Sequence, residues 1–188
     1  MNATSIHYLN VILGAGTIAL QVLSVIAIIF LFFRSKILSR NFYLDFIDKH
    51  FLTLSFFISL IASVFPLVYS EIINFLPCSL CWWQRVFMFP ALIIYAIALW
   101  DRDRKVIRYV APLLSLGFLI SAYQNFFYYF GNVSNLPCDA SGVSCYQQLV
   151  SEFGGYISIP MMALTAFFAL LTLIAVAHFY PRRKVSEI

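Results

Sequence analysis

Apolar residues fall into five long runs that are separated by shorter polar segments. A helix that crosses about 30 Å of hydrocarbon needs about 20 mainly apolar residues, and each run is close to that length. The runs cover residues 11–33, 51–70, 82–100, 109–130 and about 157–179. Arg85 is the one Lys, Arg, Asp or Glu inside them. The pattern predicts an all-α, polytopic membrane protein with five spans.

The segments between the runs are too short for a separate soluble domain, so we expect a single membrane domain. No Lys or Arg precedes the first run, which is longer than the roughly 7–15-residue apolar region of a signal peptide. We therefore expect a retained helix whose N-terminus lies outside. Composition agrees, because 62% of the residues are hydrophobic and 11% are charged, whereas a soluble domain has roughly 45–50% apolar residues.

Positive charge gathers on one side of the predicted membrane. Cytoplasmic loops near helix ends are enriched in Lys and Arg. Eleven of the twelve cations lie in three segments that belong on one side: Arg34, Lys36, Arg40, Lys49, Arg102, Arg104, Lys105, Arg108, Arg182, Arg183 and Lys184. The N-terminal tail and residues 71–80 and 131–156 contain none. We therefore expect both cysteine pairs outside and the C-terminus inside. This topology accounts for the net charge of +4, and nucleic-acid binding is disfavoured.

Cys78 and Cys81 form a CxxC motif just before the third run. Two cysteines at this spacing can close a small disulfide ring, and the positive end of a helix that begins near Cys81 stabilises a thiolate there. The motif favours thiol–disulfide exchange, although zinc sites use the same spacing. The motif alone leaves both chemistries open.

Cys138 and Cys145 lie in the longest outer segment, among glycine and small residues that allow the chain to close on itself. One interpretation is a structural staple, and the other is a labile disulfide that exchanges with the CxxC pair. A four-cysteine zinc site is geometrically possible, but this pair is not a second CxxC and no histidine is near it. We favour a relay between two redox-active pairs, which requires no metal.

Arg85 is the one cation that is not assigned to the cytoplasmic side, and it follows Cys81 by four residues. In a helix this spacing places both side chains on one face. Arg85 is expected either to reach the lipid head groups or to support the Cys81 thiolate and donate hydrogen bonds to the carbonyl of an oxidised ring.

Gln124 and Asn125 place two amides in an otherwise apolar and aromatic stretch. An amide in hydrocarbon is costly unless it finds a partner inside the bundle. Either residue is expected to hydrogen-bond a quinone or to form an interhelical hydrogen bond.

Three features occur in a fixed order: the motif LPCSLCWWQR at residues 76–85, the pair Cys138 and Cys145, and GYISIPMM at residues 155–162. In these features the chain resembles the bacterial disulfide bond formation protein B family, particularly its shorter-loop, Gram-positive-like branch. The resemblance covers roughly residues 51–179. It implies a catalytic four-helix bundle in residues 51–188 of a bacterial cytoplasmic membrane protein, with residues 1–50 adding a transmembrane helix and a cytoplasmic loop.

The resemblance also implies an activity. The chain would reoxidise a thioredoxin-like, extracytoplasmic disulfide oxidase and pass the electrons to ubiquinone or menaquinone. Cys81 would contact the quinone and Cys78 would exchange with the loop pair. In that pair Cys138 would form the mixed disulfide with the partner and Cys145 would resolve it. Arg85 matches the quinone-side arginine of the family.

The chain departs from the family pattern in three places. The first helix has no counterpart in the four-helix core, and the six residues between Cys138 and Cys145 make a shorter loop than in Gram-negative members. The family has a histidine where this chain has Gln124 and Asn125.

Two rival functions remain. The vitamin K epoxide reductase family shares the bundle and the two cysteine pairs, but its loop pair precedes its CxxC, whereas here the CxxC comes first. A membrane scaffold with stapled loops would leave Cys78 and Cys81 inert or bound to metal.

Overall fold

The computed structural model describes residues 3–33, 42–74, 77–130 and 154–180. Five stretches are long and apolar enough to cross a membrane. They comprise α1 (Ala3–Phe33), α3 (Phe51–Leu67) with its π-helical continuation η1 (Val68–Ile72), α4 (Ser79–Asp101), α5 (Ile107–Phe130) with the short 3-10 helix η2 (Arg104–Val106), and α6 (Ile159–Phe179). The described residues form no β-strand. The predicted all-α membrane fold with five spans is confirmed.

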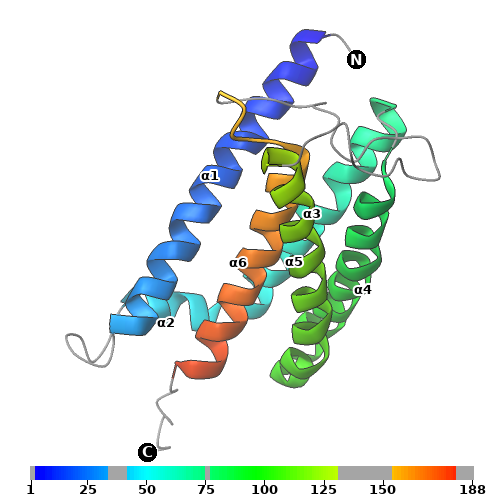
Figure 1. The fold of residues 1–188 in the computed structure, drawn as a ribbon. Helices are drawn as coiled ribbons and strands as arrows, with labels where there is room; N and C mark the ends of the chain where they lie inside the picture. Colours follow the sequence, from blue (N-terminus) through cyan, green and yellow to red (C-terminus); the bar gives the residue numbers. More distant parts are fainter. Residues whose placement is uncertain (1–2, 34–41, 75–76, 131–153, 181–188) are drawn as a thin grey trace, which may run out of the picture.

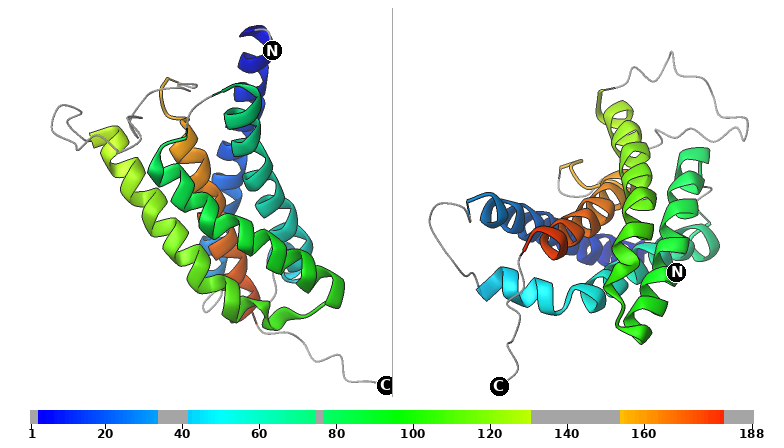
Figure 2. Two further views of the ribbon diagram at one scale, coloured as in Figure 1. Left: turned by 90° about the vertical axis from the view of Figure 1, so that its right-hand side faces the viewer. Right: turned by 90° about the horizontal axis from the view of Figure 1, so that it is seen from below.

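Helices α3, α4, α5 and α6 form a four-helix bundle, in which α3 packs on α4, α4 on α5, α5 on α6 and α6 on α3. Helix α1 lies outside this ring and packs mainly on α6 (Figure 1). The view from below shows α1 and α4 on different sides of α6 (Figure 2). The first span is therefore attached to the bundle through the last one.

A short amphipathic helix, α2 (Phe42–Lys49), connects α1 to α3. Its Leu44 and Ile47 are three residues apart, lie on one helical face and are buried. Asp48 accepts a hydrogen bond from Arg104 Nη1 at 2.7 Å, and the Arg104 guanidinium also lies over the Phe51 ring. These contacts tie the connection between α1 and α3 to the connection between α4 and α5.

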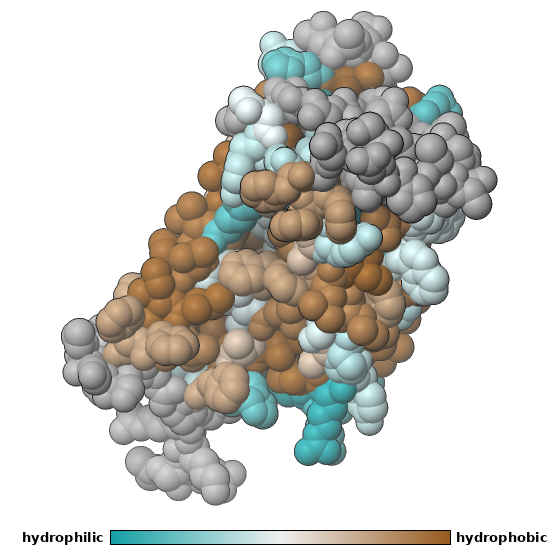
Figure 3. Space-filling model, in the orientation of Figure 1, coloured by the Kyte–Doolittle hydropathy of each residue, from teal (hydrophilic) through white to brown (hydrophobic). Residues whose placement is uncertain are grey.

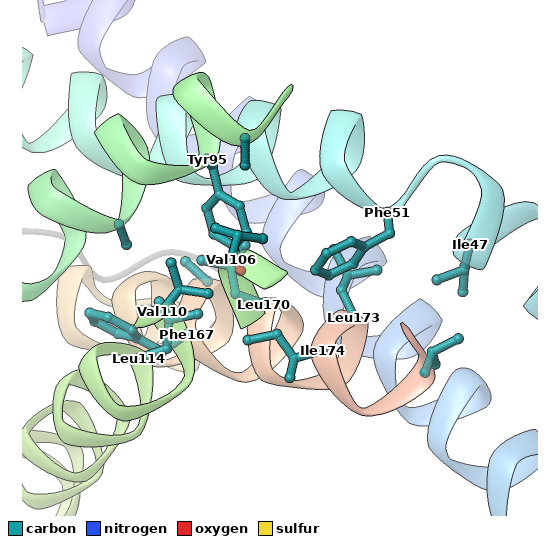
Figure 4. Packing of buried hydrophobic residues seen from close by; sticks show 14 of the residues in the cluster. Ile47, Phe51, Tyr95, Val106, Val110, Leu114, Phe167, Leu170, Leu173 and Ile174 are labelled. Atoms are coloured by element: carbon teal, nitrogen blue, oxygen red, sulfur yellow. The ribbon is translucent and has the colours of Figure 1, made fainter. Parts of the chain in front are cut away.

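A cluster of buried hydrophobic residues, among them Phe51, Tyr95, Leu114, Phe167 and Leu170, packs inside the bundle (Figure 4). On the face in Figure 3, hydrophobic residues cover the middle of the molecule and hydrophilic ones lie nearer its two ends. An apolar exterior over the middle of the helices is what a bundle surrounded by lipid requires.

Helices α5 and α6 approach each other closely at Gly117. A Cβ atom placed on Gly117 would lie 2.2 Å from a carbon of the Phe167 ring. Only a residue without a side chain therefore fits beneath that ring, which explains this glycine within a helix.

Candidate redox site

The CxxC pair lies at the N-terminus of α4. Cys78 occupies the N-cap position with an extended backbone, and Cys81 lies in the first turn. The carbonyl of Cys78 accepts a hydrogen bond from the backbone N–H of Trp82 at 3.2 Å. The helix begins at Ser79, two residues earlier than the sequence suggested, so both sulfurs lie near the positive end of its dipole.

The two sulfurs are 3.1 Å apart, in hydrogen-bond contact. Cys78 is buried, whereas Cys81 is partly exposed. The two side chains differ in access although they are three residues apart.

A pair of glutamines lies beside the sulfurs. Gln124 Nε2 of α5 donates hydrogen bonds to Cys78 Sγ at 3.6 Å and to Cys81 Sγ at 3.7 Å. Gln84 Nε2 of α4 donates to Gln124 Oε1 at 2.6 Å. Because Gln84 occupies the acceptor end of the Gln124 amide, the donor end faces the cysteines. A buried N–H donor in this position stabilises negative charge on either sulfur.

Arg85 lies one helical turn after Cys81 and is buried, with 7% of its surface exposed. Its Nη2 donates a hydrogen bond to the carbonyl of Pro66 at 2.8 Å, and its guanidinium lies 5.2 Å from the centre of the Trp82 ring. Its Nε is buried and has no hydrogen-bond partner in the part of the chain that the structure describes. The guanidinium therefore lies among protein groups and retains an unused donor.

A cavity of about 580 Å³ lies beside these residues. Cys81, Gln84 and Arg85 contribute to it from α4, and α1, α3, η1 and α6 supply mainly apolar side chains. Ligand pockets are typically about 300–1,000 Å³, apolar, and equipped with a few polar groups. A quinone has an apolar ring and tail and carbonyl oxygens that accept hydrogen bonds. The residues present therefore fit this group.

Asn125 has a different environment from Gln124. Its Nδ2 donates to the carbonyls of Ser121 and Pro160, each at 2.8 Å, and so links α5 to α6. Neither Gln124 nor Asn125 lines the cavity. Their assignment as quinone contacts stays a prediction.

Cys138 and Cys145 lie outside the described residues. Among the residues that the structure does describe, no three His, Cys, Asp or Glu side chains gather as potential metal ligands. The relay through the loop pair stays a prediction from the sequence.

Sequence reasoning missed three contributors to the site: Gln84, Pro66 and Tyr69. Gln84 was visible as a polar residue beside Arg85 in an apolar run, which is the same signal that identified Gln124. Pro66 lies within α3, and Tyr69 lies in η1, where the helix widens. A single-turn π-helix is frequent at functional sites, but the apolar pattern gives no signal for one.

Comparison with known proteins places this geometry in context. The family model for Disulfide bond formation protein DsbB matches residues 48–177. Disulfide bond formation protein C of Bacillus subtilis (strain 168) is 38% identical over 121 residues, which cover 64% of this chain and 87% of the relative.

Two further relatives are also named as disulfide formation proteins. SPbeta prophage-derived disulfide bond formation protein B of the same organism is 37% identical over 119 residues, covering 63% of this chain and 79% of the relative. Probable disulfide formation protein C 2 of Bacillus cereus (strain ATCC 10987 / NRS 248) is 31% identical over 131 residues, covering 70% of this chain and 93% of the relative. No solved structure matches the chain significantly.

Proposed function

Because this chain belongs to the DsbB family of disulfide bond formation proteins, we propose that it reoxidises an extracytoplasmic, thioredoxin-like thiol oxidase and passes the electrons to ubiquinone or menaquinone. The resemblance in the LPCSLCWWQR motif is confirmed by the family match. The observation that best supports quinone chemistry is that Cys81 and Arg85 line the same apolar cavity.

The first exchange takes place at the loop pair. A thiolate of the partner attacks Cys138 of the Cys138–Cys145 disulfide, and Cys145 leaves as a thiolate. The second partner cysteine then attacks the mixed disulfide, so that the partner leaves oxidised and the loop pair reduced. Each step requires a thiolate, an accessible sulfur and a favourable difference in potential.

The second exchange moves the same two electrons to the CxxC pair. A loop thiolate attacks Cys78 of the Cys78–Cys81 disulfide, and Cys81 leaves as a thiolate. The remaining loop thiol attacks the new mixed disulfide, which restores the loop disulfide and releases Cys78. The Gln124 amide and the dipole of α4 both stabilise the negative charge that forms on Cys81.

Cys81 and Arg85 would then hold the quinone. The reduced Cys78 and Cys81 would supply two electrons and two protons to a quinone in this cavity, so that the CxxC disulfide would re-form and the quinone would leave as the quinol. Arg85 Nε, which has no hydrogen-bond partner among the described residues, is available to donate a hydrogen bond to a carbonyl oxygen. The surrounding apolar side chains exclude water, and this strengthens the electrostatic effect of the guanidinium.

The proposed orientation follows from the charge distribution, with the N-terminus and both cysteine pairs outside a bacterial cytoplasmic membrane. A membrane-impermeant maleimide should label the reduced cysteines of intact cells. Labelling only after the membrane is breached would reverse the orientation, and it would place the cysteines in a reducing compartment.

The decisive experiment supplies the purified protein with a reduced thioredoxin-like oxidase and either quinone, and follows quinone absorbance. One quinone should be reduced for each partner disulfide formed. Cys81→Ser should abolish the reduction, because the CxxC disulfide no longer forms. Absence of quinone reduction by the wild-type protein would refute the proposal.

A second experiment tests the loop relay. In Cys145→Ser no loop disulfide forms. When this variant is given the oxidised partner, the Cys138 thiolate should attack the partner disulfide, and the mixed disulfide should accumulate because no Cys145 thiol is present to complete the exchange. If the double Cys138→Ser and Cys145→Ser variant oxidised the partner at the wild-type rate, the pair would be a staple rather than an electron carrier.

A further inference from the structure

We propose that α1, which precedes the residues matched by the family model, forms part of the quinone site by bounding the cavity on the side away from α4. This inference rests on the proposed function. Five residues of α1 line the cavity together with Cys81 and Arg85: Ile12, Leu13, Gly16, Thr17 and Leu20. We refer to these five residues as the α1 wall.

The α1 wall is one face of a helix. Its members follow one another at intervals of one, three, one and three residues, which returns to the same side of the helix with each turn. The neighbouring Ala15 and Ala19 do not line the cavity, whereas the exposed Ile12 and Gly16 do, so the cavity reaches the surface of the molecule beside α1. A continuous strip of α1 therefore borders the cavity.

Polar contacts hold the α1 wall in place at both ends. Before it, Asn10 Oδ1 accepts a buried hydrogen bond from the Tyr69 hydroxyl of η1 at 2.5 Å. After it, Gln21 Nε2 donates to Thr165 Oγ1 of α6 at 2.8 Å, and Gln21 Oε1 accepts from the Tyr156 hydroxyl at 3.0 Å. Hydrogen bonds between helices fix their contact in a lipid environment. The two ends thus bind α1 to both η1 and α6.

The cavity is divided between two parts of the chain. The family model matches residues 48–177, which contain all of α3 and α4 and all but the last two residues of α6. All of α1 precedes that match. Without α1, the surfaces of α3 and α6 that face Gly16 and Thr17 would border lipid. Helix α1 therefore converts an open side of the bundle into a bounded cavity, and it limits the volume available to a quinone.

Gly16 offers a sharp test because space surrounds it. A Cβ atom on Gly16 would meet nothing within 4 Å. Leucine is also a better helix former than glycine, so Gly16→Leu should fill part of the cavity without straining α1. Ala15→Leu is the matched control, because it makes a similar change at the preceding residue, which is exposed like Gly16 but does not line the cavity.

Binding is measured on the full-length protein in detergent with a short-chain ubiquinone and a short-chain menaquinone, through quenching of tryptophan fluorescence. Gly16→Leu should weaken binding of whichever quinone the wild-type protein binds more tightly by about tenfold or more, since a small change of volume in an apolar pocket has effects of this order. The KM for quinone should rise in parallel, while kcat at saturating quinone and the rate of thiol exchange stay unchanged. Ala15→Leu should change each quantity by less than about twofold.

Labelling adds a measurement on the wild-type protein. A quinone with a photoreactive group should label a peptide that contains residues of the α1 wall, and excess unmodified quinone should prevent it. This labelling measurement tests the role of α1 even if Gly16→Leu fails to fold.

The results separate the two proposals. Normal quinone affinity in folded Gly16→Leu, or labelling confined to α3, α4 and α6, would overturn the role of α1 and leave the quinone oxidoreductase standing. A wild-type protein that neither binds nor reduces either quinone would refute both.

Discussion

The contact between α5 and α6 and the space between α1 and α4 are two contrasting regions of one small membrane protein. At the first, Gly117 lies so close to the Phe167 ring that no Cβ atom fits. At the second, Gly16 borders a cavity of about 580 Å³ and has open space where a side chain would be. Both glycines lie in helices, but one permits close packing and the other leaves room.

The contact between α5 and α6 contributes mainly to stability, whereas the region around the cavity holds the groups proposed for the chemistry. The packed side is joined by apolar contacts and by the hydrogen bond from Asn125 of α5 to the carbonyl of Pro160 in α6. On the hollow side, Cys81 and Arg85 border the cavity. Gln124 connects the two regions, because it belongs to α5 and donates to both sulfurs. Four predictions test this division, from the largest expected effect to the smallest.

Arg85→Ala should reduce quinone turnover by about 10²–10³-fold, because it removes a positive donor from a site where negative charge develops. Arg85→Lys should recover only part of this loss, since a flexible ammonium lacks the planar guanidinium fork. Steady-state quinone reduction measures the effect, and partner oxidation in a single turnover serves as the control. Full activity in Arg85→Lys together with poor expression of Arg85→Ala would indicate a lipid-facing role instead.

Gly117→Ala should lower the free energy of unfolding by about 1–3 kcal/mol, because the added methyl group overpacks the contact with Phe167. Thermal unfolding in detergent, followed by circular dichroism, measures the change. Adding Phe167→Leu should restore part of the stability by removing the ring. Phe167 lines the cavity although Gly117 does not, so the affinity for quinone should respond more to Phe167→Leu than to Gly117→Ala. A more stable Gly117→Ala variant would contradict the packing argument.

Gln124→Met should slow exchange at the CxxC pair by about tenfold, as expected for loss of a hydrogen bond to a charged group. Methionine has a similar length but provides no N–H donor. Stopped-flow tryptophan fluorescence measures the rate. Gln84→Met should have a smaller effect, because Gln84 acts by orienting Gln124. The double variant should be no slower than Gln124→Met, and additive losses would argue against this chain of hydrogen bonds.

Asn10→Leu should weaken the contact between α1 and η1 by about 0.6 kcal/mol, the average contribution of an interhelical hydrogen bond in a membrane protein. It removes the acceptor of the Tyr69 hydroxyl and loosens the α1 wall at one end. Quinone binding should weaken by about threefold or less, because 1.36 kcal/mol corresponds to tenfold. Tyr69→Phe is the matched variant, and combining the two should cause little further loss. If the losses of quinone binding in the two single variants added up in the double variant, the hydrogen bond between Tyr69 and Asn10 would not be their cause.

The spans could be predicted from the sequence because crossing a membrane is decided by local hydropathy. The five runs and the five helices agree closely, for example 109–130 with the span Arg104–Phe130. The CxxC motif identified Cys78 and Cys81, and its spacing to Arg85 identified the guanidinium on the same face of α4. These features depend on neighbours within a few residues.

Features that depend on distant residues were not predictable in this way. The amides of Gln84 and Gln124 meet across a separation of 40 residues, and no periodicity in either helix indicates this partner. The sequence suggested that Gln124 or Asn125 would hydrogen-bond, but not that the first would contact sulfur and the second a backbone carbonyl of α6. The position of α1 beside the cavity likewise depends on contacts with α6 and η1.

The attachment of the first helix to the last has a consequence for the order of assembly. The hydrogen bond between Gln21 and Thr165 joins residues that are 144 positions apart, and α6 is the main contact of α1. During synthesis α1 is made before α6, so its docking surface exists only after α6 has been inserted. The cavity is therefore not complete before α6 is in place, and a chain that stalls before α6 has its cysteines without a bounded site beside them.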